Sequence, residues 1–220
     1  MARRRLGVLI SGRGSNLAAL IAAAAEKGFP AEIALVISDR AEAPGLSYAA
    51  GAGIPHLAIP QRERADFAAA AQSQLRRHGV ELVCLAGFMR ILADEFVAAW
   101  HDRMVNIHPS LLPAFPGLHA QRQALLAGVR FSGCTVHFVR AQVDTGPIVA
   151  QAVVPVQPDD DEASLSARIL AAEHRLYPLA VRLIGEGRVQ VRDERAEIDG
   201  WRAPLLTAFN PPEPLVSPAA

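Results

Sequence analysis

Residues 6–17 read Leu6-Gly7-Val8-Leu9-Ile10-Ser11-Gly12-Arg13-Gly14-Ser15-Asn16-Leu17, and this stretch decides the fold. The apolar run at its start predicts a buried strand, and the glycines that follow predict a sharp turn. Ser15 and Asn16 then open an alanine-rich helix that continues to about Glu26 and stops before Gly28. A strand, a glycine turn and a helix in this order begin a βαβ unit.

The same alternation continues through the first half of the chain. Short apolar runs predict strands at Ile33–Ser38, His56–Ile59, Leu82–Leu85 and Val105–Ile107. Between them, helices are expected at Gly45–Ala52 and Ala65–Arg77. Strands joined by helices predict a mostly parallel, Rossmann-like α/β sheet that helices cover on both faces.

The second half has a different pattern. Thr135–Val139 and Ile148–Val156 flank a tight loop from Gln142 to Pro147, which predicts antiparallel strands added to the parallel sheet. Ser164–Ile184 predicts a long helix, whose apolar positions at helical spacing should face the core: Leu165, Ile169, Ala172, Leu176, Leu179 and Leu183. We expect a single domain over residues 1–203 and a proline-rich tail over residues 204–220.

Composition narrows the function classes. The 220 residues are 51% hydrophobic and 20% charged with a formal net charge of zero, which indicates a globular protein and argues against nucleic-acid binding. Cys84 and Cys134 are too far apart for a metal motif, and no HExxH pattern occurs, so we expect no metal. So few cysteines favour a reducing compartment. Because its apolar runs are too short for a signal peptide or a membrane span, we expect a cytoplasmic protein.

The glycine turn itself is a candidate binding loop. The amides that open a helix, with the positive end of its dipole, suit a phosphate. The loop is not a dinucleotide fingerprint, because position 17 is Leu rather than Gly, and it lacks the Gly-Lys-Ser/Thr of a P-loop. An ordinary turn with Ser15 or Asn16 capping the helix explains the residues about equally well.

A second candidate is the run Asn106-Ile107-His108-Pro109-Ser110-Leu111-Leu112-Pro113. Alternation along a strand puts Asn106 and His108 on the same side, and the carboxyl end of a parallel strand opens into the ligand crevice. An amide and an imidazole there can donate to an oxyanion and move a proton. The alternative is a histidine packed against a turn.

The third candidate is Asp144, in the run Asp144-Thr145-Gly146-Pro147. A carboxylate at this place can stabilise an imidazolium. Plain turn chemistry is the alternative, and spacing alone favours it. His137 falls within a predicted strand, which favours a structural role, and Cys134 is expected to be buried and inert.

Together these segments resemble the folate-dependent phosphoribosylglycinamide formyltransferase family, from about Leu6 to Ile198. The motifs occur in order and at family spacing. They are residues 9–17, Leu85-Ala86-Gly87-Phe88-Met89-Arg90-Ile91-Leu92, residues 106–113, Gly133-Cys134-Thr135-Val136-His137-Phe138-Val139, Asp144-Thr145-Gly146-Pro147-Ile148 and Glu173-His174 followed by Tyr177-Pro178.

The resemblance implies transfer of a formyl group from 10-formyltetrahydrofolate, as co-substrate, to the amine of glycinamide ribonucleotide in purine synthesis. It implies Asn106, His108 and Asp144 as catalytic residues, and Gly14, Ser15, Asn16 and Glu173 as the acceptor site. Folate would contact Arg64, Met89, Arg90, Ile91, Leu92, Asn106, Arg140, Ala141, Gln142, Val143 and Asp144. Arg13 departs from the Asn that is frequent in the family's loop. We expect a monomer or a homodimer.

Three other functions are weighed. A formyltetrahydrofolate hydrolase shares the Asn-x-His and Asp arrangement, although similar sequences carry an extra N-terminal domain and this chain begins at its first strand. A methionyl-tRNA formyltransferase has an added C-terminal domain and a basic surface, which this sequence lacks. From another class, a non-catalytic folate- or nucleotide-binding module would not need the three catalytic residues.

Overall fold

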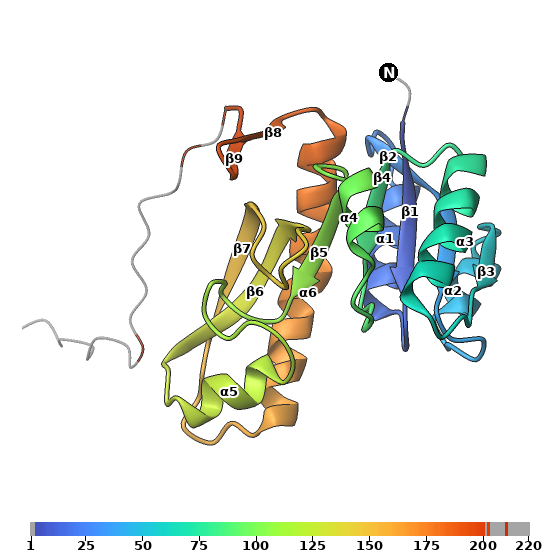
Figure 1. Cartoon of the computed structure of the whole chain (residues 1–220). Coiled ribbons are helices and arrows are strands. Elements are labelled where there is room, and N and C mark those ends of the chain that lie inside the picture. Colours follow the sequence, from blue (N-terminus) through green and yellow to red (C-terminus); the bar gives the residue numbers. More distant parts are fainter. Residues whose placement is uncertain (1–2, 201, 203–209, 211–220) are drawn as a thin grey trace, which may run out of the picture.

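The computed structural model describes residues 3–200, 202 and 210, so the predicted tail lies outside the described residues apart from Asn210. Seven strands form one sheet in the order β3-β2-β1-β4-β5-β6-β7 (Figure 1). Their bounds are β1 Arg4–Ile10, β2 Ala31–Ser38, β3 His56–Ala58, β4 Leu82–Leu85, β5 Met104–His108, β6 Phe131–Phe138 and β7 Ile148–Pro155. A separate hairpin pairs β8 (Val189–Arg192) with β9 (Arg195–Ile198).

The sheet is mixed, as predicted. Strands β1 to β5 pair in parallel, whereas β6 pairs antiparallel with both β5 and β7. The parallel strands are joined by α1 (Ser15–Ala25), α2 (Leu46–Gly51), α3 (Arg64–Arg77) and α4 (Asp94–Ala99), and α5 (Ala120–Leu126) and α6 (Glu162–Gly185) follow. The predicted α/β class, with antiparallel strands in the C-terminal half, is therefore confirmed.

Helices cover the sheet on both faces. Leu6, Val8 and Ile10 of β1 belong to a buried cluster that includes residues of α1 and α6. Leu9, which points the other way, belongs to a second cluster with residues of α3 and α4. This two-sided burial explains why the parallel strands are continuous apolar runs rather than alternating ones.

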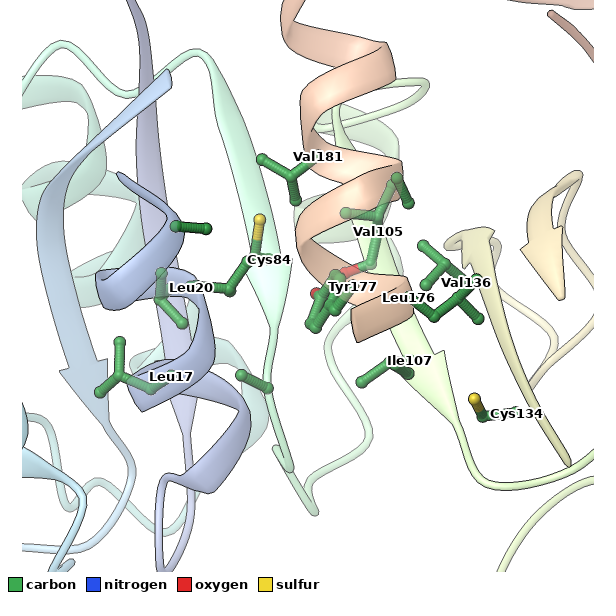
Figure 2. Packing of buried hydrophobic residues seen from close by; sticks show 14 of the residues in the cluster. Leu17, Leu20, Cys84, Val105, Ile107, Cys134, Val136, Leu176, Tyr177 and Val181 are labelled. Carbon is green, nitrogen blue, oxygen red and sulfur yellow. The ribbon is translucent and has the colours of Figure 1, made fainter. Parts of the chain in front are cut away.

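Helix α6 crosses the sheet behind β4 and β5. Tyr177 is fully buried there, and its hydroxyl donates to the carbonyls of Leu85 (3.0 Å) and Val105 (3.2 Å). Figure 2 shows Tyr177 between Cys84 of β4 and Val105 of β5. The Tyr177 hydroxyl is thereby satisfied by backbone carbonyls of two neighbouring strands, which fixes α6 on the face of the sheet opposite Asn106 and His108.

Some sequence-based expectations need correction. Leu179 was expected to face the core but is 49% exposed, because the buried stripe of α6 instead runs through Glu173, Tyr177 and Ala180. Helix α4 and the β8–β9 hairpin were not predicted. Strand β6 begins at Phe131, four residues before the predicted Thr135. The prediction began too late because Ser132 and Gly133 are weak strand formers and hide the start of the strand.

Candidate active site

Asn106 and His108 come from β5, two residues apart, so their side chains share one face of the strand. The other face, with Val105 and Ile107, packs into the cluster that includes α6. In the pairing with β6, Asn106 lies opposite His137, and opposite residues also share a face. The strand register therefore gathers an amide and two imidazoles on the face that is turned away from α6.

The ring of His108 lies between two acceptors and is almost fully buried. Its Nδ1 atom is 3.2 Å from Oδ2 of Asp144, and its Nε2 atom is 2.9 Å from the carbonyl oxygen of Phe115. A neutral imidazole has one N–H, so only the doubly protonated ring donates to both neighbours. The two ring nitrogens of His108 therefore each face an oxygen acceptor.

Asp144 supplies the negative charge of the site. Its Oδ2 atom also accepts from the Gly117 amide at 2.8 Å, and its Oδ1 atom is 3.6 Å from Nε2 of His137. Burial opposes ionisation, but the His137 ring, the Gly117 amide and the charge of His108 outweigh it and hold the pKa of Asp144 below its usual value. The backbone of Asp144 is left-handed, with φ 54°. The carboxylate is thus ionised and directed at two histidines.

His137, for which the sequence favoured a structural role, lies beside Asn106 and Asp144. Its Nδ1 atom is 2.9 Å from the Phe138 carbonyl, and its Nε2 atom is 3.3 Å from Nδ2 of Asn106. The Asn106 amide and the Asp144 carboxylate therefore both face Nε2 of His137. Its position beside Asn106 depends on the register between β5 and β6, and the sequence of one strand alone does not reveal that register.

The glycine loop carries the features expected of an anion site. Gly14 caps α1 with φ 76°, no side chain caps the helix, and its first turn holds no acidic residue. Ala18 makes the first helical hydrogen bond, to Gly14, so the amides of Ser15, Asn16 and Leu17 have no intrahelical partner. Capping by Ser15 or Asn16, the alternative, is not observed. A hollow of about 480 Å³ adjoins the loop, lined by Ser11, Gly12, Arg13 and residues 40–44.

Asn16 and Glu173 form a second group, on the α1 and α6 side of the sheet. Nδ2 of Asn16 donates to Oε2 of Glu173 at 2.7 Å, and both residues are buried. Burial raises the pKa of Glu173 to about 7, although the Asn16 hydrogen bond opposes the shift. The Oδ1 atom of Asn16 is buried without a partner. The pair therefore has both a titrating carboxyl and a free acceptor.

The residues expected at folate lie on several loops. Met89 is 65% exposed, Ile91 52% and Val143 50%, whereas Leu92 is buried. Arg90 binds the carbonyls of Gln61 and Arg62 and stacks over Phe67. Arg64 is exposed at the start of α3, and Ala141 and Gln142 are exposed in the β6–β7 loop. The Arg140 guanidinium binds Glu194 and Asp102. Exposed apolar side chains on these loops suit a flat aromatic ligand.

Within residues 3–200, 202 and 210, no group of three or more His, Cys, Asp or Glu side chains is arranged to hold a metal ion. Over the same described residues, no helix has the length and apolar character needed to cross a membrane. Both cysteines are buried, and burial raises the pKa of each thiol to about 12, so neither is a reactive thiolate at neutral pH.

Comparisons with known proteins agree on one family. A sequence model described as "Formyl transferase" matches residues 4–181. A phosphoribosylglycinamide formyltransferase of Escherichia coli K12 is 42% identical over 90% of this chain and 94% of its own length. A trifunctional purine biosynthetic protein adenosine-3 of Drosophila melanogaster is 50% identical over 87% of this chain. This chain spans only 15% of that relative's length.

Solved structures give the same result. Glycinamide ribonucleotide transformylase 1 from Symbiobacterium toebii superposes with a TM-score of 0.86 at 51% identity, over 89% of this chain and 94% of that one. A formyltetrahydrofolate deformylase from Pseudomonas syringae has a TM-score of 0.84 but only 28% identity, and this chain covers 66% of it.

Proposed function

The chain belongs to the phosphoribosylglycinamide formyltransferase family, and from this membership we propose that it transfers the formyl group of 10-formyltetrahydrofolate to the amine of glycinamide ribonucleotide in de novo purine biosynthesis. The single observation that carries the proposal is the contact of 3.2 Å between His108 and Asp144, with Asn106 on the same strand face. A single domain over residues 1–203 and a cytoplasmic location remain predictions.

In the proposed reaction, the acceptor amine attacks the formyl carbon of the donor. The carbonyl oxygen becomes an oxyanion in a tetrahedral intermediate, and Asn106 and the imidazolium of His108 donate to it. The oxyanion competes with the Phe115 carbonyl for the Nε2 proton of His108. Asp144 stabilises the imidazolium and relays, through water, the proton that the amine loses.

The intermediate then collapses and breaks the bond between the formyl carbon and N10 of the folate. N10 takes up a proton, so the products are formylglycinamide ribonucleotide and tetrahydrofolate. No covalent enzyme intermediate is required, because holding both substrates together supplies much of the rate. The mechanism requires one anion, one cation and one amide near the formyl carbon. Asp144, His108 and Asn106 would supply them in that order.

The acceptor's phosphate is assigned to the amides of Gly14, Ser15 and Asn16. Support comes from the uncapped start of α1, because the helix dipole and free amides there favour an anion. Its ribose hydroxyls are assigned to Glu173, with the unpartnered Oδ1 atom of Asn16 as a second acceptor beside it. A buried carboxyl next to a free amide oxygen suits a vicinal diol.

The folate is assigned to Arg64, the Met89–Leu92 segment, Asn106 and the loop from Arg140 to Asp144. The exposed apolar side chains of Met89, Ile91 and Val143 support this assignment, since they leave apolar surface for a ring system. For Arg140 the support is limited to its backbone, because its guanidinium is engaged by Glu194 and Asp102. We propose no metal in the reaction.

The hydrolase is the alternative that shares this chemistry, since water in place of the amine would release formate. The higher identity to transformylases than to the deformylase favours transfer. The test is tetrahydrofolate formation with 10-formyltetrahydrofolate, with and without glycinamide ribonucleotide. We expect product only with the acceptor. Equal product without it indicates a hydrolase, and binding of both ligands with no turnover indicates a binding module.

A further inference from the structure

The loop that carries Asp144 is fastened at one end by a side chain that the proposed mechanism does not use. The loop spans residues 139–147 between β6 and β7. Its last residues are held by backbone contacts, because Phe138 donates to the Pro147 carbonyl at 2.9 Å and a Cβ on Gly146 would lie 1.8 Å from the Phe138 oxygen. At its start, the Val139 amide donates to the Met104 carbonyl of β5 at 2.9 Å, and the next residue is held by its side chain, the guanidinium of Arg140.

The Arg140 guanidinium uses all three of its nitrogens. Nε donates to Oε2 of Glu194 at 2.7 Å and Nη2 to Oε1 at 3.2 Å, Nη2 also donates to Oδ1 of Asp102 at 2.7 Å, and Nη1 donates to the Val139 carbonyl at 3.1 Å. The Arg140 side chain is only 14% exposed. A fork bound on two sides by carboxylates has a fixed orientation, unlike a single surface ion pair.

The two carboxylates come from parts of the chain that are distant in sequence. Asp102 lies two residues before Met104, where β5 begins, and β5 carries Asn106 and His108. Glu194 lies at the tip of the β8–β9 hairpin, where it and Asp193 have φ values of 56° and 48°. Left-handed residues other than glycine persist where their surroundings hold them. Arg140 thus joins the Asp144 loop to the β5 segment and to the hairpin.

We propose that Arg140, clamped by Glu194 and Asp102, is a positioning residue that holds the Asp144 loop against β5 and so keeps the Asp144 carboxylate on His108. The guanidinium's hydrogen bonds go to Glu194, Asp102 and Val139 and not to Asn106, His108 or Asp144, so it acts through the loop backbone. The β8–β9 hairpin then has a role in catalysis, as the arm that presents Glu194. The catalytic part of this inference rests on the proposed function, whereas the clamp itself does not.

Arg140 also affects the ionisation of Glu194. The hydrogen bond from Arg140 holds the pKa of Glu194 below its usual value, although the carboxyl is exposed. His101 also faces this group, with Nδ1 3.3 Å from Oδ2 of Asp102. Removing the charge of both carboxylates by mutation is therefore the direct perturbation of the clamp.

The test uses the full chain with Glu194→Gln and Asp102→Asn combined, which leaves Arg140 and the proposed folate contacts in place. Glu197→Gln is the matched control. It removes a carboxylate from the same hairpin, but this carboxylate pairs with Arg192 at 3.4 Å and not with Arg140. Backbone hydrogen exchange of residues 139–147 reports the clamp, and kcat with the acceptor KM reports its catalytic effect.

We expect the double variant to exchange several-fold faster in this loop and to lose about tenfold in kcat, with the acceptor KM within about twofold, because misplacing a catalytic group lowers the rate at saturation. Adding Arg140→Met should cause no further loss, since the three side chains act as one unit. Unchanged loop exchange would overturn the clamp. Faster exchange with unchanged kcat would overturn the positioning role. If the wild type lacks transferase activity, the proposed function fails while the exchange result still decides the clamp.

Discussion

Nδ1 of His108 lies 3.2 Å from Oδ2 of Asp144, and the two side chains are only 6% and 8% exposed. When the ring is protonated, two charges this close and this shielded from water interact far more strongly than a surface pair. The two residues are distant in sequence, because His108 ends β5 and Asp144 lies in the loop between β6 and β7.

His108→Ala removes the cationic donor. We expect kcat to fall on the order of 10²–10⁴-fold, with folate still bound, because the variant loses a donor to the oxyanion. Asn106→Ala should act likewise, and the double variant should lose much less than the product of the two effects, since both serve one intermediate. Steady-state kinetics measure this. His56→Ala, at an exposed histidine, is the control and should behave as wild type. Near wild-type turnover of His108→Ala would remove the residue from the mechanism.

Gly14→Val tests the phosphate loop. The φ of 76° disfavours any side chain, and a Cβ there would lie 2.6 Å from Cα of Gly45, so the loop must shift. Calorimetry on protein shown by circular dichroism to be folded should find acceptor affinity reduced far more than folate affinity. Gly51→Ala, where a Cβ meets nothing within 4 Å, should change neither. Unaltered acceptor affinity in a folded Gly14→Val protein contradicts the assignment.

Glu173→Gln tests the buried carboxyl, whose pKa is raised to about 7. Between about pH 4.5 and 7 the folded protein keeps a proton that the unfolded chain releases, so the wild-type free energy of unfolding falls as pH rises. The glutamine variant cannot ionise. Its stability relative to wild type should therefore rise across this window, by up to about 3 kcal/mol, and level off above pH 7. Denaturant titrations at several pH values measure the difference, and a difference that does not vary with pH argues against the raised pKa.

Exhaustive chelation tests the expectation that no metal takes part. Attack of an amine on an activated formyl donor is served by the donors and charges of Asn106, His108 and Asp144, so we expect full activity in excess chelator. Loss of activity that added zinc or magnesium restores would show that a metal is required.

Local patterns predicted much of the fold and part of the site. The strand, glycine turn and helix at Leu6–Ala25 follow from short-range rules, as does the shared face of Asn106 and His108. The approach of Asp144 to His108 does not, because it depends on how a loop folds back over β5. Spacing alone favoured a turn there, and only the family resemblance indicated catalysis.

Other features were missed for physical reasons that can be named. The β8–β9 hairpin turns at Asp193-Glu194, which lacks the glycine or asparagine that normally signals such a turn. Helix α4 is six residues long and has no side-chain cap. His137 lies at the site because it is opposite Asn106 in the pairing of β5 with β6. The partners of the Arg140 side chain are Asp102 and Glu194, which are distant in sequence. Each of these contacts is long-range and has no local signature.

The most direct test of the central claim is the single-turnover rate of formyl transfer by Asp144→Asn, with both substrates saturating and circular dichroism confirming the fold. Asparagine suits a turn as well as aspartate does, so the change removes the charge and keeps the loop shape. If the anion stabilises the His108 imidazolium and accepts the amine proton, the rate should fall by on the order of 10²-fold or more. A folded Asp144→Asn protein that transfers formyl at the wild-type rate would contradict the account.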